Sequence, residues 1–429
     1  MTILYAVLLV FIIVLIWRIN HPGDLRLNKR FVGRYVQDLQ GRGPTQVKVT
    51  RLRIGAIAPN QVEDRAHYSL ETGFADGSKR LLLAEIVYPL EQLQRERDKN
   101  SRPGMDEMMP DPMNSATMGN RGDYLEKLRE DPFKDLSKEE QVIAARAEQL
   151  AAEVEGLKRL NNIGVLFPRL IAHDAKQMIT LTEGIGSKRL DDLLQQRDRA
   201  GRVELLRPVI ADLATFHQRG KTIAGYFPPG AGHSDKKIKT ELQNSLSAWD
   251  KVGATVSQDD FVQVMDLSEP LLETSEAEKG LRLVDSSPRA YFMQGNRAGR
   301  ANWDGVRTDV SAFDVIELVC DPAVALTAAE EVGLFKHYLQ CRELPEAERE
   351  DYERQMLRLA VYFRLVLLGY LAHYRVAKVA QPDAGIKYWT PGSIAGASKN
   401  LLEMMSMEPG LSGLLDKLRG PLTLMSELK

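Results

Sequence analysis

The sequence is short of the residue types that build disulfide frameworks and metal sites. Among its 429 residues there are two cysteines, Cys320 and Cys341, and seven histidines. Two cysteines are too few for a disulfide scaffold or a cysteine zinc site, so a reducing compartment fits best. The histidines show no metal-ligand spacing, and the motifs HExxH, GxxxxGK[ST] and GxSxG are absent. The sequence therefore predicts no metal centre and no P-loop or serine-hydrolase site.

The chain also lacks an excess of charge of either sign. Its formal net charge is -2, and its only concentration of cations lies between Arg18 and Arg53. A nucleic-acid partner is not expected, because binding a phosphate backbone needs a broad basic surface. The hydrophobic share of 44% is enough for a sizeable core, and the length suggests two or three domains.

Charge is missing altogether from residues 1–17, "MTILYAVLLVFIIVLIW". At 1.5 Å per residue this segment reaches about 25 Å as a helix, near the lower limit for crossing a bilayer. A cleaved signal peptide and a buried core helix are the alternatives. The absence of a basic start and the aromatic residue at the boundary favour a membrane anchor. We expect its apolar surface to include Leu4, Leu8, Phe11, Leu15 and Trp17.

Basic residues follow the apolar segment rather than precede it. Because cytoplasmic flanks carry the excess of Lys and Arg, the sequence predicts a single-pass protein with its N-terminus outside and its main domain in the cytoplasm. Residues 18–45 form the basic juxtamembrane segment, which either contacts anionic lipid or is simply solvated. The predicted partners are the lipid bilayer and a protein of unknown identity. The basic residues are Arg18, Arg26, Lys29, Arg30 and Arg34.

Strand patterns and then helix patterns follow this segment. Three β-rich stretches at 46–54, 67–74 and 79–88 predict an antiparallel sheet. Residues 98–123 are rich in Pro, Gly, Asn, Asp and Met without periodicity, which predicts a flexible insertion; a methionine-rich strip that binds a partner is the alternative. Residues 138–160 have the spacing of a packed amphipathic helix.

The second half of the chain is predicted to be mainly helical. We place an α+β region with its insertion at 46–185 and the helical region at 186–429. Within the latter, residues 358–379 are apolar enough to suggest a second membrane span. Arg358, Arg364 and His373 interrupt the apolar run, so a buried core helix is favoured.

Three fragments resemble the aminoglycoside phosphotransferase and related small-molecule kinase families. They are "AAEVEGLKRLNNIGVLFPRLIAHD" at 151–174, "VIADLATFHQRG" at 209–220 and "CDPAVAL" at 320–326. The resemblance extends in fragments from Val47 to Val379. It implies an α+β fold, in which a small lobe built on an antiparallel sheet precedes a larger helical lobe, as in protein kinases.

The residues that phosphoryl transfer requires are not found at the positions that this resemblance implies. The third strand reads Leu83-Ala84-Glu85-Ile86 where the family has Lys or Arg, which would leave the helix carboxylate Glu153 without an ion pair. The family's HGD-x-x-x-x-N becomes Gln294-Gly295-Asn296, with Asn302 one residue beyond the usual spacing. An amide cannot act as the general base.

The position at which the family has its metal-binding Asp also lacks a well-placed acid. Counting back from Asp321-Pro322 gives Phe313, and Asp314 occupies the position only if the loop is one residue shorter; a turn or capping Asp is the alternative for Asp314. The segment between the first two strands contains a single glycine, Gly55. A loop whose backbone wraps around phosphates usually contains several glycines. The histidine of the second fragment, His217, is expected to pack at a helix end.

These losses predict a membrane-anchored cytoplasmic pseudokinase that acts as a scaffold, adaptor or regulator. No cofactor is expected, although weak nucleotide binding stays open. Two alternatives remain. One is an atypical nucleotide-dependent transferase that uses Asp314, Asp321 or Glu85 for metal, and the other is a membrane-tethered assembly protein of unrelated α+β fold.

Overall fold

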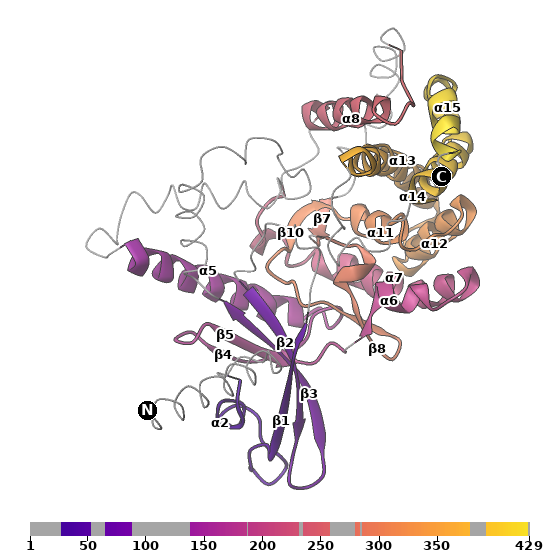
Figure 1. Ribbon diagram of the computed structural model, residues 1–429. Helices are drawn as coiled ribbons and strands as arrows, with labels where there is room; N and C mark the ends of the chain where they lie inside the picture. The colour runs from indigo at the N-terminus through magenta and orange to yellow at the C-terminus, as the bar shows by residue number, and fades with distance from the viewer. Residues whose placement is uncertain are drawn as a thin grey trace, which may run out of the picture.

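The computed structural model describes residues 27–52, 65–87, 138–186, 188–230, 235–257, 279–283, 285–377 and 392–427 (Figure 1). The predicted anchor at 1–17, the insertion at 98–123, and Gly55, Arg18 and Arg26 lie outside these residues. Anchor and insertion therefore stay predictions.

The N-terminal lobe is built on a five-stranded antiparallel sheet in the order β1-β2-β3-β5-β4. The three strands predicted from the alternating pattern are present, and a second hairpin completes the sheet. In the turn between β2 and β3, the Asp76 carboxylate accepts from the Ser78 N–H at 2.8 Å, and Gly77 adopts a left-handed φ of 82°. The strands are β1 (Gln46–Leu52), β2 (Arg65–Gly73), β3 (Lys79–Val87), β4 (Leu170–Asp174) and β5 (Ile179–Glu183).

The two faces of this sheet are covered by different segments. Because side chains alternate along a strand, Ala66, Tyr68 and Leu70 of β2 lie on one face, where they pack with the short helix α2 (Lys29–Val32). The opposite face carries Arg65 and turns toward the long helix α5 (Lys138–Asn161). The strong helix formers of α5 and its apolar spacing explain the helix that the sequence predicts.

The C-terminal lobe is mainly helical, with two small sheets where it meets the N-terminal lobe (Figure 1). The small sheets have the orders β6-β8-β9 and β10-β7. Their strands are β6 (Lys188–Arg189), β7 (Lys279–Arg282), β8 (Phe292–Gln294), β9 (Arg297–Gly299) and β10 (Arg307–Val310). The helices are α6 (Leu190–Gln195), α7 (Arg199–Gly220), α8 (Asp235–Asp250), α11 (Ala312–Val319), α12 (Ala328–Cys341), α13 (Glu346–Ala377), α14 (Gly392–Met407) and α15 (Ser412–Ser426), with short 3-10 turns η2 (Ala224–Tyr226), η4 (Pro288–Ala290) and η5 (Pro409–Leu411).

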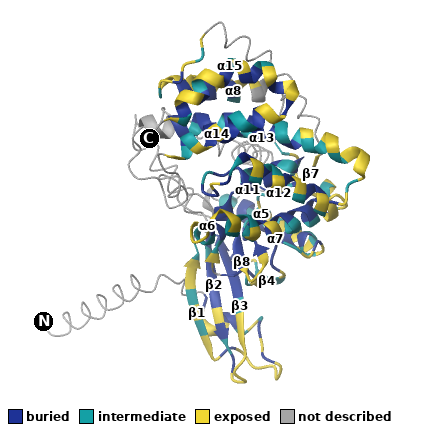
Figure 2. Ribbon diagram, turned by 90° about the vertical axis from the view of Figure 1, so that its right-hand side faces the viewer, coloured by how far each residue is buried: buried dark blue, intermediate teal, exposed yellow. Residues whose placement is uncertain are grey.

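Helix α13 is the apolar segment that suggested a second membrane span. Within the described ranges, its portion Glu346–Ala372 is the one helix long and apolar enough to cross a bilayer, and 67% of its most apolar window is buried inside the protein. Figure 2 shows this helix surrounded by other elements of the lobe, with exposed residues concentrated at its N-terminal end. The interpretation as a core helix agrees with this packing.

The chain forms a sheet lobe, with its helix between the third and fourth strands, and then a helical lobe. This is the two-lobed α+β fold that the resemblance to kinases implies. The alternative of an unrelated fold is therefore not supported. The main hydrophobic core extends from Leu157 and Leu160 of α5 through α7 and α11 to α15, so the lobes share apolar contacts. The lobes meet where the candidate site residues gather.

Candidate functional site

Arg65 lies at the centre of an ion-pair cluster between the sheet and α5. Its Nη1 donates to Glu85 Oε1 at 2.6 Å and to Glu153 Oε2 at 2.7 Å, and its Nη2 donates to Glu153 Oε1 at 2.7 Å. Asp304, from the loop that follows β9, lies 3.7 Å from the same Nη1. The cluster therefore joins the two lobes.

The prediction that Glu153 has no ion pair is wrong. The third strand does present Glu85 instead of a cation, but β2 pairs antiparallel with β3, and Arg65 lies opposite Val87, close to Glu85 on the same face. The cation thus comes from the second strand, 88 residues from its partner on the helix. A motif search along the third strand could not find it.

One guanidinium in this cluster faces three carboxylates. Burial raises the pKa of Glu153, and the attraction of Arg65 opposes that rise only in part. Burial alone would lower the pKa of Arg65, but the charges of Asp304, Glu153 and Glu85 hold it well above its ordinary value. Arg65 therefore stays charged, and three carboxylates share it. His67 Nε2 is a second nitrogen beside one of them, 3.6 Å from Glu85 Oε2.

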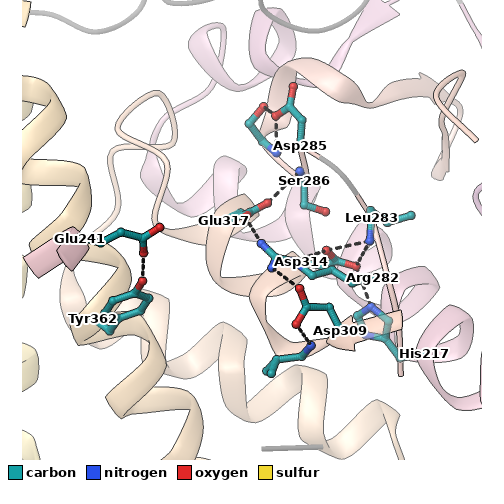
Figure 3. Close-up of polar contacts among 12 residues, drawn as sticks. His217, Glu241, Arg282, Leu283, Asp285, Ser286, Asp309, Asp314, Glu317 and Tyr362 are labelled. Atoms are coloured by element: carbon teal, nitrogen blue, oxygen red, sulfur yellow. Dashed lines mark hydrogen bonds and ion pairs between the residues drawn. The ribbon is translucent and has the colours of Figure 1, made fainter. Parts of the chain in front are cut away.

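A second cluster surrounds the loop between β7 and β8 (Figure 3). Asp314 of α11 accepts from the Leu283 N–H at 2.9 Å and pairs with His217 Nε2 at 2.9 Å. Glu317, one turn later on the same helix, accepts from the Ser286 N–H at 3.0 Å. Both carboxylates hold the loop's backbone against α11.

These contacts bear on the predictions made for His217 and Asp314. His217 lies in the last turn of α7 and is buried, where its second ring nitrogen bonds the Tyr338 hydroxyl at 2.7 Å, so its predicted packing role is confirmed. Asp314 is 0% exposed, and its oxygens are occupied by protein donors. The hypothesis that Asp314 binds a metal is not supported; it is a positioning carboxylate.

The loop contains a carboxylate that the sequence analysis missed, Asp285. Its φ of 56° is left-handed, a conformation that costs a non-glycine residue on the order of 1–3 kcal/mol and that clusters at functional sites. Its side chain accepts from the Ser287 hydroxyl and pairs with Arg289 Nε at 3.5 Å, while its carbonyl accepts from Arg300 Nη2 at 2.9 Å. Burial would raise the pKa of Asp285, but Arg289 and the hydrogen bonds of Ser287 bring it below its ordinary value.

The structure corrects the predicted position of the catalytic loop. Gln294-Gly295-Asn296 belongs to the hairpin between β8 and β9, in which Gly295 has a φ of 62° and Asn296 is exposed. The loop that follows β7 instead places Asp285 five residues before Ala290. In the kinase pattern H-R-D-x-x-x-x-N the Asn comes five residues after the Asp, and the residue five positions after Asp285 is Ala290.

Asn302 also has a different place from the one predicted. It follows β9 and precedes the buried Trp303 and then Asp304. In the order of kinase motifs the metal-binding D-F-G comes after the catalytic loop, and here Asn302-Trp303-Asp304 follows the β7–β8 loop and begins with an amide.

Asp321, the last of the predicted residues, is buried at the start of the turn before α12. It accepts from the Ala323 N–H at 2.8 Å, and burial raises its pKa to about 6, with Arg289 acting in the opposite direction. It is therefore a turn-capping acid. Among the described residues, no group of three or more His, Cys, Asp or Glu side chains is arranged to hold a metal ion.

No protein-family model and no curated protein sequence matches this chain. Solved structures with a similar fold include a choline/ethanolamine kinase family protein from Mesorhizobium loti (12% identity, 91% of this chain and 98% of that chain, TM-score 0.41). Choline kinase from Cryptosporidium parvum Iowa II is similar at 10% identity (92% and 100%, TM-score 0.46). The aminoglycoside phosphotransferase APH(2'')-Ib with ADP is similar at 11% identity (86% and 94%, TM-score 0.38).

Proposed function

We propose that this chain is a membrane-anchored cytoplasmic pseudokinase, which serves as a scaffold, adaptor or regulator of a membrane-associated assembly and does not transfer phosphoryl groups. The observation that carries the proposal is the sharing of Arg65 among Glu153, Glu85 and Asp304. In a protein kinase the cation that pairs with the helix Glu also contacts the α- and β-phosphates of ATP. Here two additional carboxylates occupy the region where a nucleotide would bring several negative charges.

The substitutions at the metal positions add to this proposal. Phosphoryl transfer depends on Mg²⁺ that bridges the phosphates and neutralises the developing charge. Ala290 offers no ligand, and Asn302 offers a neutral amide, whereas Mg²⁺ is usually held by one or two carboxylates. Without the metal, the repulsion between ATP and the acids around Arg65 is not compensated.

One observation favours a second candidate, an atypical nucleotide-dependent transferase. Asp285 keeps a carboxylate at the position of the catalytic base, in a left-handed conformation that its surroundings maintain. A general base of this kind typically contributes 10²–10⁴-fold to a rate, so its loss would be measurable. In the pseudokinase, by contrast, the Asp285–Arg289 pair serves to close the loop.

A phosphoryl-transfer assay separates the two candidates. The full-length chain in lipid nanodiscs is incubated with γ-labelled ATP, Mg²⁺ or Mn²⁺, and candidate acceptors, together with the variants Asp285→Asn and Asn296→Ala. Asn296 is the matched control because it lies exposed in the β8–β9 turn. We expect no transfer from any of the three proteins. Transfer that Asp285→Asn abolishes and Asn296→Ala preserves would establish the transferase instead.

A further inference from the structure

The basic juxtamembrane segment is partly built into the N-terminal lobe. Leu27, Phe31, Val32 and Val36 are buried in one apolar cluster with the outer face of the five-stranded sheet. The Asn28 side chain accepts from the Phe31 N–H at 3.0 Å and caps α2. Residues 27–36 are therefore a folded part of the lobe, and any surface they present has a fixed orientation relative to it.

The side of α2 away from the sheet is cationic. Because Phe31 and Val32 face the sheet, Lys29, Arg30 and Arg34 are directed away from it, and all three are exposed. None of them forms a salt bridge with another residue in the described ranges. Their charges are thus available to an anionic surface.

A rigid turn beside α2 presents an apolar side chain. Asp38 accepts from the N–H groups of Gln40 at 2.9 Å and Arg42 at 2.8 Å, and Arg42 Nε donates to the same carboxylate at 3.0 Å. This network leaves Leu39 94% exposed at the tip, while the Asp38 side chain is 0% exposed. A lone exposed leucine is ordinary on a protein surface. Its position on a pinned turn next to unpaired cations is what suggests a role.

The turn and the helix are adjacent in space. A Cβ added to Gly33, directly after α2, would lie 3.4 Å from Pro44 Cδ and 3.7 Å from Gly43 Cα, so the chain returns past α2 after the turn. Figure 1 shows α2 beside β1. In the sequence, nine residues, 18 to 26, separate the uncharged segment 1–17 from Leu27.

We propose that the docking face formed by Lys29, Arg30, Arg34 and Leu39 binds the anionic surface of the bilayer. This inference rests on the proposed membrane anchoring, and it adds a second contact that sets how the lobe lies on the membrane. The cations are attracted to anionic headgroups, and Leu39 enters the interface as an apolar tip. The fixed turn avoids the ordering cost that a flexible loop would bear on binding.

Site-directed spin labelling of the full-length chain tests whether the docking face binds the bilayer surface. Leu39→Cys is labelled, with Leu424→Cys as the matched control, because Leu424 is an exposed leucine (54%) on α15 of the other lobe. Cys320 is buried and Cys341 half-buried, and the unsubstituted chain gives their background. The chain is placed in nanodiscs of phosphatidylcholine alone or mixed with phosphatidylserine, and the accessibility of each label to oxygen and to a water-soluble nickel complex is measured.

In the mixed nanodiscs we expect the label at 39 to become accessible to oxygen and protected from nickel, while the label at 424 stays in water. Replacing Lys29, Arg30 and Arg34 by Gln should lower the equilibrium constant for docking roughly 100-fold. Each cation near an anionic surface contributes about a fivefold factor, and the three factors multiply. A water-exposed label at 39 in the mixed nanodiscs would overturn the inference, as would equal insertion into both kinds of nanodisc. Carbonate extraction of the chain would instead contradict the anchor itself.

Discussion

Arg65 is the residue on which the charge balance between the two lobes depends. Replacing it by Met removes the guanidinium from the buried carboxylates of Glu153 and Glu85, a change that typically costs about 3–5 kcal/mol, although His67 Nε2 still lies 3.6 Å from Glu85. We expect Arg65→Met to lower the free energy of unfolding by that amount in urea titrations. The control is Arg169→Met, which breaks an ion pair with Glu183 whose side chains are 73% and 48% exposed and should cost no more than about 1 kcal/mol. Equal effects of the two variants would contradict the central role of Arg65.

A second residue-scale prediction concerns Asp321 and pH. Its pKa is about 6 in the folded protein and near 3.8 in an unfolded chain. Between these values the folded state binds the proton and the unfolded state does not, so this group stabilises the fold at low pH and the contribution is lost as pH rises from about 4 to 6. The full difference corresponds to roughly 3 kcal/mol.

Replacing Asp321 by Asn should remove this pH dependence. Compared with the native chain, the variant should gain stability between pH 4 and 7 by an amount approaching roughly 3 kcal/mol. Asp351→Asn is the control, because its side chain is 71% exposed and its variant should follow the native pH profile. Parallel profiles for the Asp321 variant and the native chain would contradict the raised pKa.

At the same scale, the sequence located some site residues and missed others for identifiable reasons. Glu153 and Glu85 were found because local patterns define the helix and the third strand that carry them. Arg65 was missed because its role follows from cross-strand pairing and from a helix 88 residues away. Asp285 was missed because its motif has lost both the usual histidine and the Asn, leaving a single Asp five residues before Ala290.

At the scale of elements, helix α11 acts as a support for the loop that carries Asp285. Removing the Asp314 carboxylate leaves the Leu283 N–H and His217 without their buried acceptor, and each unsatisfied group costs about 1–3 kcal/mol. We expect Asp314→Ala to destabilise the fold and to speed amide exchange in the peptide covering residues 285–300. Asn296→Ala, in the exposed turn of the same peptide, should leave both properties unchanged. Unaltered exchange in Asp314→Ala would show that α11 does not hold the loop.

The elements themselves were largely predictable, and their connections were not. Alternating apolar residues gave the three strands of the first lobe, and helical spacing gave α5 and α13. The β8–β9 hairpin was mistaken for a catalytic loop, because "QGN" looks like a degenerate HGD and the sequence alone does not reveal the left-handed turn at Gly295. Short strands of three residues carry too little periodic pattern to be recognised.

At the scale of the whole molecule, the lobe arrangement and the sequence of the N-terminus together define an orientation that can be measured. We expect the full-length chain to resist carbonate extraction, and a C-terminal tag to be protected from protease in intact cells, because the basic flank follows the apolar segment. Deleting residues 1–17 should abolish the resistance to extraction. Digestion of the tag from outside would reverse the orientation, and a truncated chain that still behaves as an integral protein would mean that another segment anchors it.

The central claim is the proposal that the Arg65 charge is engaged by acids of the protein and that Ala290 and Asn302 offer Mg²⁺ no carboxylate, so that ATP is not held. Equilibrium dialysis of the full-length chain in nanodiscs with labelled ATP, with and without Mg²⁺, tests this most directly. We predict no saturable binding at physiological ATP concentrations under either condition. Saturable, Mg²⁺-dependent binding of ATP would contradict the claim. If Asn302→Ala, a substitution at a half-buried residue, abolished this binding, the result would favour a nucleotide-dependent transferase.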